Sequence, residues 1–310
     1  MGTFRHGIQT NIDVKKRIPF LTGDAVSAYL LILPFFVFFF LFVLSPLLRN
    51  FLNSFTNDSL GVKEFIGFRN YEKLLRDRSF LRSVLNTFTF ALFSIVPLMV
   101  LGFAAALSVN RPKKAMYAAR AVLMYPYVAS MVSVSMIWLY LFDPGSGLFN
   151  KVLWMAGFSG SDWLFDEKLA LPCLIVVNVW KMIGYVMILY LAALQGVPQS
   201  QYDAAVVDGA GFLGATWHVT LPAIRPVSFF LLATLSIECF KTFEQVRIMT
   251  NGGPLDATTT ITHQIYMRAF SEFKMGYASA MSVVLFLMVF VVTLLNLKFG
   301  GQLEEDRGNG

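Results

Sequence analysis

Charged residues are scarce in this chain of 310 residues, because Asp, Glu, Lys and Arg together make up only 14% of it. An average soluble domain contains about 25% charged residues, so the composition excludes an ordinary soluble domain. Hydrophobic residues account for 56% of the chain and include 31 Phe. This balance indicates a membrane protein. The net charge of +6 fits basic flanks of membrane helices, and we expect no nucleic-acid partner.

Cysteine and histidine are also rare, with 2 and 3 residues respectively. Cys173 and Cys239 both fall within long apolar runs, which is not the pattern of a disulfide framework or of a metal site. His6, His218 and His263 are isolated from one another along the sequence. We therefore expect neither a disulfide nor a metal site.

Motifs for nucleotide binding and covalent catalysis are missing from the sequence. We find no P-loop, no His-Glu-x-x-His and no nucleophile elbow, so no catalytic residue is predicted. Gly209, Gly211 and Gly214 do spell G-x-G-x-x-G. That fingerprint needs a buried strand before it and an acidic residue about 20 positions later. Here a Gln-, Asp- and Ala-rich stretch precedes it, and the next acidic residue, Glu238, lies inside an apolar run.

Six apolar runs are long enough to cross about 30 Å of hydrocarbon. The predicted spans are residues 25–48, 83–109, 121–142, 169–194, 227–249 and 275–297. Together they form a six-span domain over residues 25–298, preceded by a polar leader over residues 1–24 and followed by a polar tail over residues 299–310. We expect an uncleaved leader and no separate soluble domain. Lys and Arg are evenly divided between the two sides, so the positive-inside rule does not decide the orientation.

The polar segment between the fourth and fifth spans, residues 199–226, has an unusual composition for a loop. It opens with an alanine-rich stretch that favours a helix, which Gly209 and Gly211 then interrupt. Pro222 and Pro226 close it. The pattern predicts a short helix, a sharp turn and a second short helix. An exposed helix with small residues on one face is shaped to enter a groove on a partner.

At these residues the chain resembles the permease subunits of binding-protein-dependent ABC importers, especially those for sugars. The signature of that family is Glu-Ala-Ala, two residues, Asp-Gly-Ala, and a hydrophobic stretch that ends in Leu-Pro. The matching residues here are Asp203, Ala204, Ala205, Asp208, Gly209, Ala210, Leu221 and Pro222. Asp203 replaces the usual Glu, and Thr216 replaces a common aromatic residue, with Trp217 beside it. The resemblance implies a cytoplasmic coupling helix that docks into a cleft on an ATPase subunit. The alternative is a surface loop whose small residues only permit a turn.

A second motif follows the fifth span, where Thr250 precedes Asn251, Gly252, Gly253 and Pro254. Asn-Gly-Gly-Pro is a strong turn that ends a helix. The motif closely resembles the outer loop after the fifth span in one class of sugar permeases. The resemblance implies a loop at the mouth of the translocation path, where a solute-binding protein docks. The alternative is again a turn and nothing more.

Charged residues interrupt the fifth span at a spacing of three: Glu238, Lys241, Glu244 and Arg247. Residues three apart on a helix stay close to one face, so these four form a charged stripe, and the stripe should avoid lipid because a charge facing lipid is costly. Phe240 and Phe243 flank the stripe and could stack on sugar rings, and Asn178 and Lys181 of the fourth span lie at similar depth. Two interpretations stay open. The residues line the solute path, or they form a Glu238–Lys241 and Glu244–Arg247 network that holds helices together.

The two motifs together imply an all-α membrane protein with the fold of type I ABC importer permeases. The implied function is translocation of a sugar or oligosaccharide that a solute-binding protein delivers. The implied partners are a second, paralogous permease subunit and two ATPase subunits that bind ATP and Mg²⁺, so no cofactor is expected in this chain. The implied location is the bacterial inner membrane, in contact with lipid, with both termini in the cytoplasm. The alternative is an ion-gradient-driven secondary transporter, although the inverted repeat typical of many such carriers is not seen.

Overall fold

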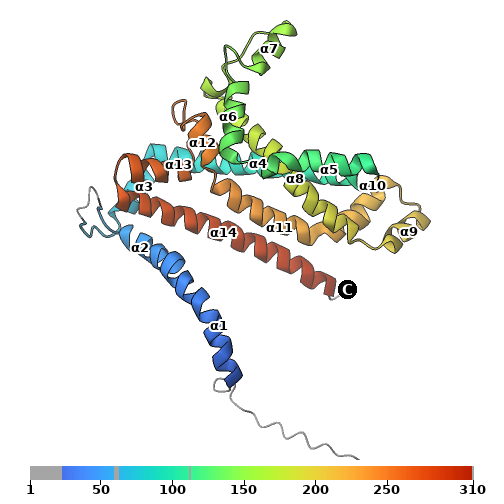
Figure 1. The fold of residues 1–310 in the computed structure, drawn as a ribbon, viewed down its shortest axis with the longest axis horizontal. Helices are drawn as coiled ribbons and strands as arrows, with labels where there is room; N and C mark the ends of the chain where they lie inside the picture. Colours follow the sequence, from blue (N-terminus) through green and yellow to red (C-terminus); the bar gives the residue numbers. More distant parts are fainter. Residues whose placement is uncertain (1–22, 59–62, 112, 309–310) are drawn as a thin grey trace, which may run out of the picture. The chain divides into compact units, whose positions relative to one another are not determined.

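The computed structural model describes residues 23–58, 63–111 and 113–308. Within these residues the chain is helical and loop-like, with one isolated antiparallel bridge between Thr56 and Phe65 (Figure 1). It divides into two compact units, Met1–Arg49 and Asn50–Gly310, and each is considered by itself. The predicted leader lies almost wholly outside the described residues.

The described residues of the first unit, 23–49, are helical and mostly apolar. α1, Gly23–Phe39, passes through the π-helical turn η2, Phe40–Leu44, into α2, Ser45–Asn53. Phenylalanine rings stack along it at a spacing of four residues, with centroids 6.0 Å apart for Phe35 and Phe39. The stretch Ala28–Asn53 is long and apolar enough to cross a membrane. Because every backbone group of a helix bonds within the helix, such a stretch is stable against lipid.

The second unit holds the remaining helices. They are α3 Arg69–Arg76, α4 Arg78–Val109, α5 Lys114–Val128, α6 Met131–Leu141, α7 Leu148–Met155, η3 Trp163–Phe165, α8 Ala170–Gln195, α9 Gln199–Val207, α10 Phe212–Ala215, η4 Thr216–Thr220, α11 Leu221–Phe240, α12 Glu244–Met249, α13 Ile261–Tyr266, η5 Met267–Ser271 and α14 Met275–Gly308. Among the described residues, five helices are long and apolar enough to span a membrane, and the bent pair of α5 and α6 would make a sixth.

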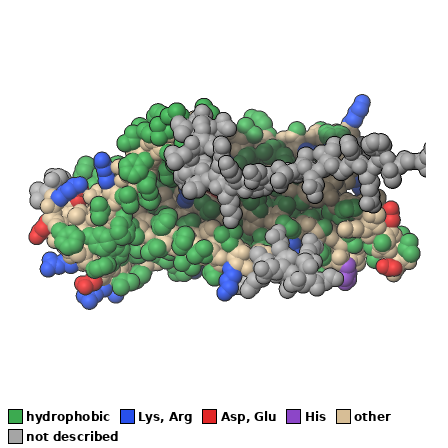
Figure 2. All heavy atoms as spheres, turned by 90° about the horizontal axis from the view of Figure 1, so that it is seen from below, with side chains coloured by type: hydrophobic (Ala, Val, Ile, Leu, Met, Phe, Trp, Pro, Cys, Tyr) green, Lys and Arg blue, Asp and Glu red, His purple; other side chains and the backbone are tan. Residues whose placement is uncertain are grey.

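The core of this unit forms where α4 packs along α8 and where α11 contacts α4, α8 and α14. Leu98, Leu174 and Leu231 are fully buried there. Gly102 lets α4 approach α8 closely, because a Cβ at this position would lie 2.5 Å from Cγ1 of Val186. Outward-facing side chains are largely apolar, and in Figure 2 most charged side chains lie toward the two ends of the visible face. Helices with an apolar outer band are suited to contact lipid.

α4 begins at Arg78, five residues before the predicted span. The prediction started later because it followed the apolar run, and the first turns of the helix contain Arg78 and Arg82. Asp77 caps the helix and accepts hydrogen bonds from the amides of Ser79 at 3.0 Å and Phe80 at 3.3 Å. Arg82 forms an ion pair with Glu167. At the other end of the unit, the helix that contains the predicted sixth span continues through the predicted tail to Gly308.

The predicted third span, residues 121–142, differs from a single straight helix. It is divided into α5 and α6, which meet at an angle of 97° (Figure 1). Ala129, with φ −66° and ψ 145°, and Ser130, with φ −59° and ψ 136°, are extended and break the helix. A break frees carbonyl groups at the end of α5, and these need donors from elsewhere.

The fifth span also differs from the prediction. Helical backbone runs from Phe212 to Phe240 through α10, η4 and α11, stops, and resumes as α12 at Glu244. Side chains at the start of α13 stabilise this second break. The Thr260 hydroxyl donates to the carbonyl of Thr242 at 3.0 Å, and the Thr262 hydroxyl donates to that of Phe240 at 3.2 Å. The four charged residues of this region therefore do not share one continuous helix, and the stripe predicted from their spacing is wrong.

Candidate functional site

The 199–226 segment contains the helix, turn and second helix that its glycines predict. α9 ends at Val207, and Gly209 adopts φ +79°, a conformation that favours glycine. The amide of Ala210 donates to the carbonyl of Ala205 at 2.8 Å, which closes the end of α9. The Tyr202 hydroxyl lies 3.2 Å from that of Thr220 and ties α9 to η4.

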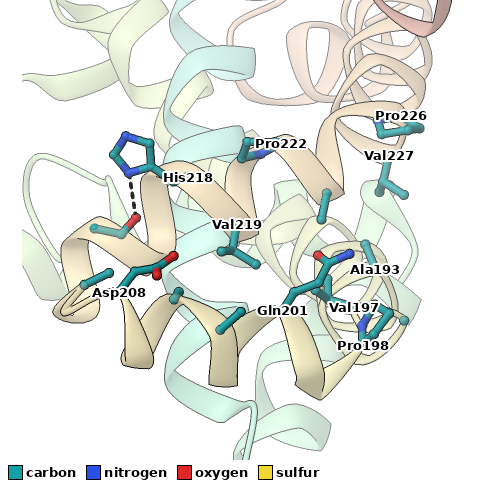
Figure 3. Close-up of a pocket in the computed structure, with 16 residues that line it drawn as sticks. Ala193, Val197, Pro198, Gln201, Asp208, His218, Val219, Pro222, Pro226 and Val227 are labelled. Carbon is teal, nitrogen blue, oxygen red and sulfur yellow. Dashed lines mark hydrogen bonds between the residues drawn. The ribbon is translucent and has the colours of Figure 1, made fainter. Parts of the chain in front are cut away.

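A cavity of about 980 Å³, here the α9 cavity, lies between α9, the end of α8 and the start of α11. Four motif residues of α9 and its turn line it, namely Ala204, Ala205, Asp208 and Ala210, and Pro222 of the same motif lines it from α11. Figure 3 shows Asp208 and His218 at one end and Val197 and Pro198 at the other. Asp203 accepts a hydrogen bond from Gln199 at 3.2 Å. The motif residues therefore lie together on α9 and its turn.

Large apolar side chains are exposed on the same segment. Val207 is 87% exposed, and its apolar neighbours on α9, α10 and η4 are Val206, Phe212, Leu213 and Trp217. We call these five exposed side chains the apolar patch, and exposed apolar surface of this kind is typical of a site of interaction. The prediction for this segment rested on its small residues and did not include these large apolar side chains. Their signal was the presence of several large apolar residues in a stretch that lies outside the membrane spans.

A second cavity, of about 240 Å³, lies where α11 breaks before α12, and we call it the α12 cavity. It brings together five residues predicted to line a path: Asn178, Lys181, Glu238, Lys241 and Glu244. The helix break separates Lys241 and Glu244 from Glu238, although all three line the cavity. The remaining lining residues are Met131, Met182, Leu235, Cys239, Thr242 and Gln245.

The two phenylalanines predicted to stack on a sugar have other partners. Phe240 is buried in the core and packs edge-on against Phe88, with ring centroids 5.1 Å apart. The ring of Phe243 lies 5.0 Å from that of Tyr266. Because the helix stops at Phe240, these rings do not flank a stripe as the spacing of the sequence predicts.

Ion pairing in this region is sparse. Glu238 and Lys241 form a loose pair at 3.9 Å, with side chains 62% and 60% exposed. Among the described residues, no ion pair joins Glu244 to Arg247, the other predicted pair. Arg247 instead contacts Asn251 and lies 5.2 Å from the centre of the Tyr266 ring. A charge network that holds these helices together is therefore limited to one exposed pair.

Lys181 lines the α12 cavity, as predicted for the path residues, and it also has a structural role that the sequence did not indicate. It is 9% exposed, and its ammonium donates to the carbonyls of Ala129 at 2.6 Å, Tyr127 at 3.0 Å and Pro126 at 3.3 Å. These are the carbonyls that the break between α5 and α6 releases. Gly184, one turn further along α8, permits the close approach, because a Cβ there would lie 2.7 Å from the Cα of Met124. Lys181 thus stabilises the bend from the neighbouring helix.

The loop after α12 is held in one conformation. Asn251 with φ 49° and Gly252 with φ +84° form the turn, and the Gly253–Pro254 peptide bond is cis. A Cβ on Gly252 would lie 2.8 Å from Cε1 of His263, so only glycine fits. The Thr258 hydroxyl donates to the carbonyl of Gly253 at 2.8 Å.

The same loop is anchored on α4. The Asn86 amide donates to the carbonyls of Asp256 at 2.8 Å and Thr259 at 3.0 Å. The Ser79 hydroxyl donates to the Asp256 carboxylate at 2.9 Å and accepts from Gln264 at 2.6 Å. These bonds anchor the loop within the second unit, and Asn86 supplies two of them.

A charged cluster joins the start of α4 to η5 and α14. Asp77 lies 3.6 Å from Arg268 and accepts a hydrogen bond from Tyr277 at 2.7 Å, and Glu272 lies 2.5 Å from Arg268 and 2.6 Å from Lys274. Burial raises the pKa of Asp77, but the bonds from Tyr277 and two amides and the charge of Arg268 outweigh it and lower that pKa. The pKa of Glu272 is lowered in the same way, because Arg268 and Lys274 outweigh its burial.

The chain is similar to known transport proteins. A family model described as "Binding-protein-dependent transport system inner membrane component" matches residues 98–300, which include both motifs. The chain is 31% identical over 282 residues to the trehalose/maltose transport system permease protein MalF of Thermococcus litoralis, covering 89% of this chain and 94% of that protein. It is 35% identical over 275 residues to the sn-glycerol-3-phosphate transport system permease protein UgpA of Yersinia pestis, covering 87% of this chain and 92% of that protein.

Solved structures share the fold. One of them is a bacterial alginate ABC transporter in complex with an alginate pentasaccharide-bound periplasmic protein, and the likeness has a TM-score of 0.79 at 23% identity. The match covers 88% of this chain and 93% of the chain in that complex. At this identity the likeness shows the architecture, which is the type I ABC importer permease fold predicted from the two motifs.

Proposed function

The chain belongs to the family of binding-protein-dependent transport system inner membrane components, and from this premise we propose how it moves its solute. It is a multi-pass permease subunit of an ABC importer. We propose that the cargo is a sugar or oligosaccharide delivered by a solute-binding protein. ATP is hydrolysed on separate ATPase subunits, so this chain binds no nucleotide. The 199–226 segment and both termini lie in the cytoplasm.

The observation that carries the proposal is the uninterrupted helical run from Phe212 to Phe240. Its first residues belong to the exposed apolar patch of the 199–226 segment, and its last turn reaches the α12 cavity at Glu238. At 1.5 Å per residue it spans roughly 40 Å. A packed helix moves as a unit, so a displacement of the patch is transmitted to the wall of the α12 cavity.

The patch supplies the contact with the ATPase subunit. Val207 and Leu213 extend from α9 and α10, and Asp203 and Asp208 lie beside them on the same segment. An apolar anchor with a polar rim is the usual composition of a protein interface. Gly209 sets the angle between the two short helices through its positive φ. The motif residues Ala204, Ala205 and Ala210 are small and let this segment enter a cleft.

The α12 cavity supplies the solute path. Asn178, Glu238, Lys241 and Glu244 give it polar groups of both charge signs, which suits a hydroxyl-rich solute. Its volume of about 240 Å³ is below the roughly 300 Å³ from which ligand pockets usually start. A second, paralogous permease subunit therefore completes the path. The exposed side chains of Glu238 and Lys241 face this interface or its water, because charges at membrane depth avoid lipid.

The anchored turn at Asn251, Gly252, Gly253 and Pro254 supplies a surface on the opposite side of the membrane from the 199–226 segment. Because Asn86 and Ser79 fix it to α4, it can receive the solute-binding protein without reorganisation. The ion-gradient carrier considered from the sequence finds no support in these relatives, which are named as transport-system permease proteins.

Co-purification tests the proposal. The chain is extracted in mild detergent from its host and its partners are identified by mass spectrometry, for wild type, Val207→Asp and Val152→Asp. Val207 lies in the patch, whereas Val152 is an exposed valine on α7, outside the 199–226 segment. We expect an ATPase and a second permease with wild type and Val152→Asp, and loss of the ATPase alone with Val207→Asp. Retention of the ATPase by Val207→Asp would contradict the docking role of the patch.

A further inference from the structure

Gln245 is a buried amide without a partner. It is the second residue of α12, directly after the helix break, and it is 1% exposed. Both its Nε2 and its Oε1 are shielded and lack a hydrogen-bond partner among the described residues. A buried primary amide that makes no hydrogen bond carries the full cost of its lost hydration.

Other buried amides of the chain are paired. Asn70 donates to the carbonyls of Ser54 and Thr56, Asn86 to those of Asp256 and Thr259, and Asn150 to those of Pro144 and Ser161. Gln264, the other buried glutamine, donates to Ser79 at 2.6 Å. The fold therefore satisfies its structural amides, and Gln245 is the exception among these five. A leucine or methionine of similar volume would fill the same space without that cost.

The position of Gln245 provides the reason for the exception. It lines the α12 cavity together with Glu238, Lys241 and Glu244, at the point where the helix break brings α12 against α6. A primary amide offers one acceptor oxygen and two donor hydrogens in one plane. Adjacent hydroxyls of a saccharide present a donor and an acceptor at matching separation.

We propose that Gln245 is a solute-recognition residue, whose amide hydrogen-bonds the hydroxyl groups of a saccharide in the α12 cavity. This inference rests on the proposed function, because it requires that the cavity belong to the path. The amide has no hydrogen-bond partner among the described residues, and a solute in the cavity would supply one. A site that hydrogen-bonds a hydroxyl also discriminates against molecules that lack it, since its own polar group would then stay unpaired.

The test compares Gln245→Met with Gln264→Met in the complete importer, in two arms. The first arm measures thermal unfolding without solute. If the Gln245 amide is unpaired, methionine at this position leaves the melting temperature unchanged or raises it. The matched control, Gln264→Met, removes a paired amide and lowers it. A fall for Gln245→Met comparable to that of the control would overturn the inference, because it would show that the protein or the second permease subunit already satisfies the amide.

The second arm measures ATP-dependent uptake of labelled maltose, trehalose and cellobiose into vesicles, with the solute-binding protein present. For a probe that the wild-type importer transports, we expect Gln245→Met to raise KM about tenfold, the effect of one lost hydrogen bond in a dry site. A wild-type KM would overturn the inference. If the wild-type importer took up none of these probes, the proposed cargo would be in doubt, and the melting temperatures would decide the inference by themselves.

Discussion

Replacement of Lys181 by methionine is the sharpest test of how the broken helix is held. Methionine keeps the length and apolar stem of the side chain but removes the ammonium. The carbonyls of Pro126, Tyr127 and Ala129 then lose a donor that now lies 2.6 to 3.3 Å away. All three lie where α5 ends in extended backbone, and Lys181 is only 9% exposed, so little water can replace its ammonium.

The magnitude follows from these contacts. Each carbonyl left unsatisfied costs about 1–3 kcal/mol. Removing the ammonium also removes the cost of its burial, which offsets part of that loss. We therefore expect a net loss of about 3 kcal/mol in the free energy of unfolding, near the lower end of three such losses. The bend between α5 and α6 should loosen before the rest of the second unit.

Denaturant or thermal unfolding of the purified importer measures this effect. Lys241→Met is the matched control, because Lys241 lines the same cavity but is 60% exposed and has only a loose partner in Glu238. An exposed pair of this kind contributes about 0–1 kcal/mol. If Lys181→Met and Lys241→Met reduced stability equally, the reasoning about the bend would be refuted.

Two further predictions concern packing and pH. Gly184→Ala should destabilise the subunit by about 1–3 kcal/mol, because its Cβ would meet the backbone of Met124. Gly211→Ala should be neutral in the same unfolding assay, because a Cβ added there would meet no atom within 4 Å and the φ of −74° suits alanine. Thermal stability should fall as the pH drops below about 4, near the ordinary values of Asp and Glu. Asp77 and Glu272 have lowered pKa values, so the stability that they contribute is present above the unfolded values and is lost as the pH falls through the folded ones. Asp77→Asn should reduce this dependence, and an unchanged pH profile would contradict the assignment.

Structural features that depend only on neighbouring residues in the sequence were predictable. Long apolar runs predicted the positions of the long helices α4, α8 and α14, and Gly209 with Gly211 predicted the turn between α9 and α10. The turn at Asn251 and Gly252 could be recognised because few residues other than glycine and asparagine tolerate positive φ.

The helix breaks were not predictable, since each depends on a partner distant in sequence. The bend after Val128 is stabilised by Lys181, and the break after Phe240 is stabilised by Thr260 and Thr262. A spacing of three residues indicates one helical face only while the helix continues, so Glu244 and Arg247 could not be placed from it. Gln245 was missed for a related reason, because a lone glutamine in an apolar run does not reveal whether its amide has a partner.

The central claim is that the helical run from Phe212 to Phe240 transmits ATPase closure to the α12 cavity. Its most direct test is the accessibility of a cysteine at position 241, introduced as Lys241→Cys with Cys173 and Cys239 replaced by alanine. Labelling by a polar maleimide is compared between the resting importer and the importer trapped with ATP and vanadate. The account predicts a change in labelling rate that disappears when Val207→Asp is added. A rate that is the same in both states, or a change that survives Val207→Asp, would contradict it.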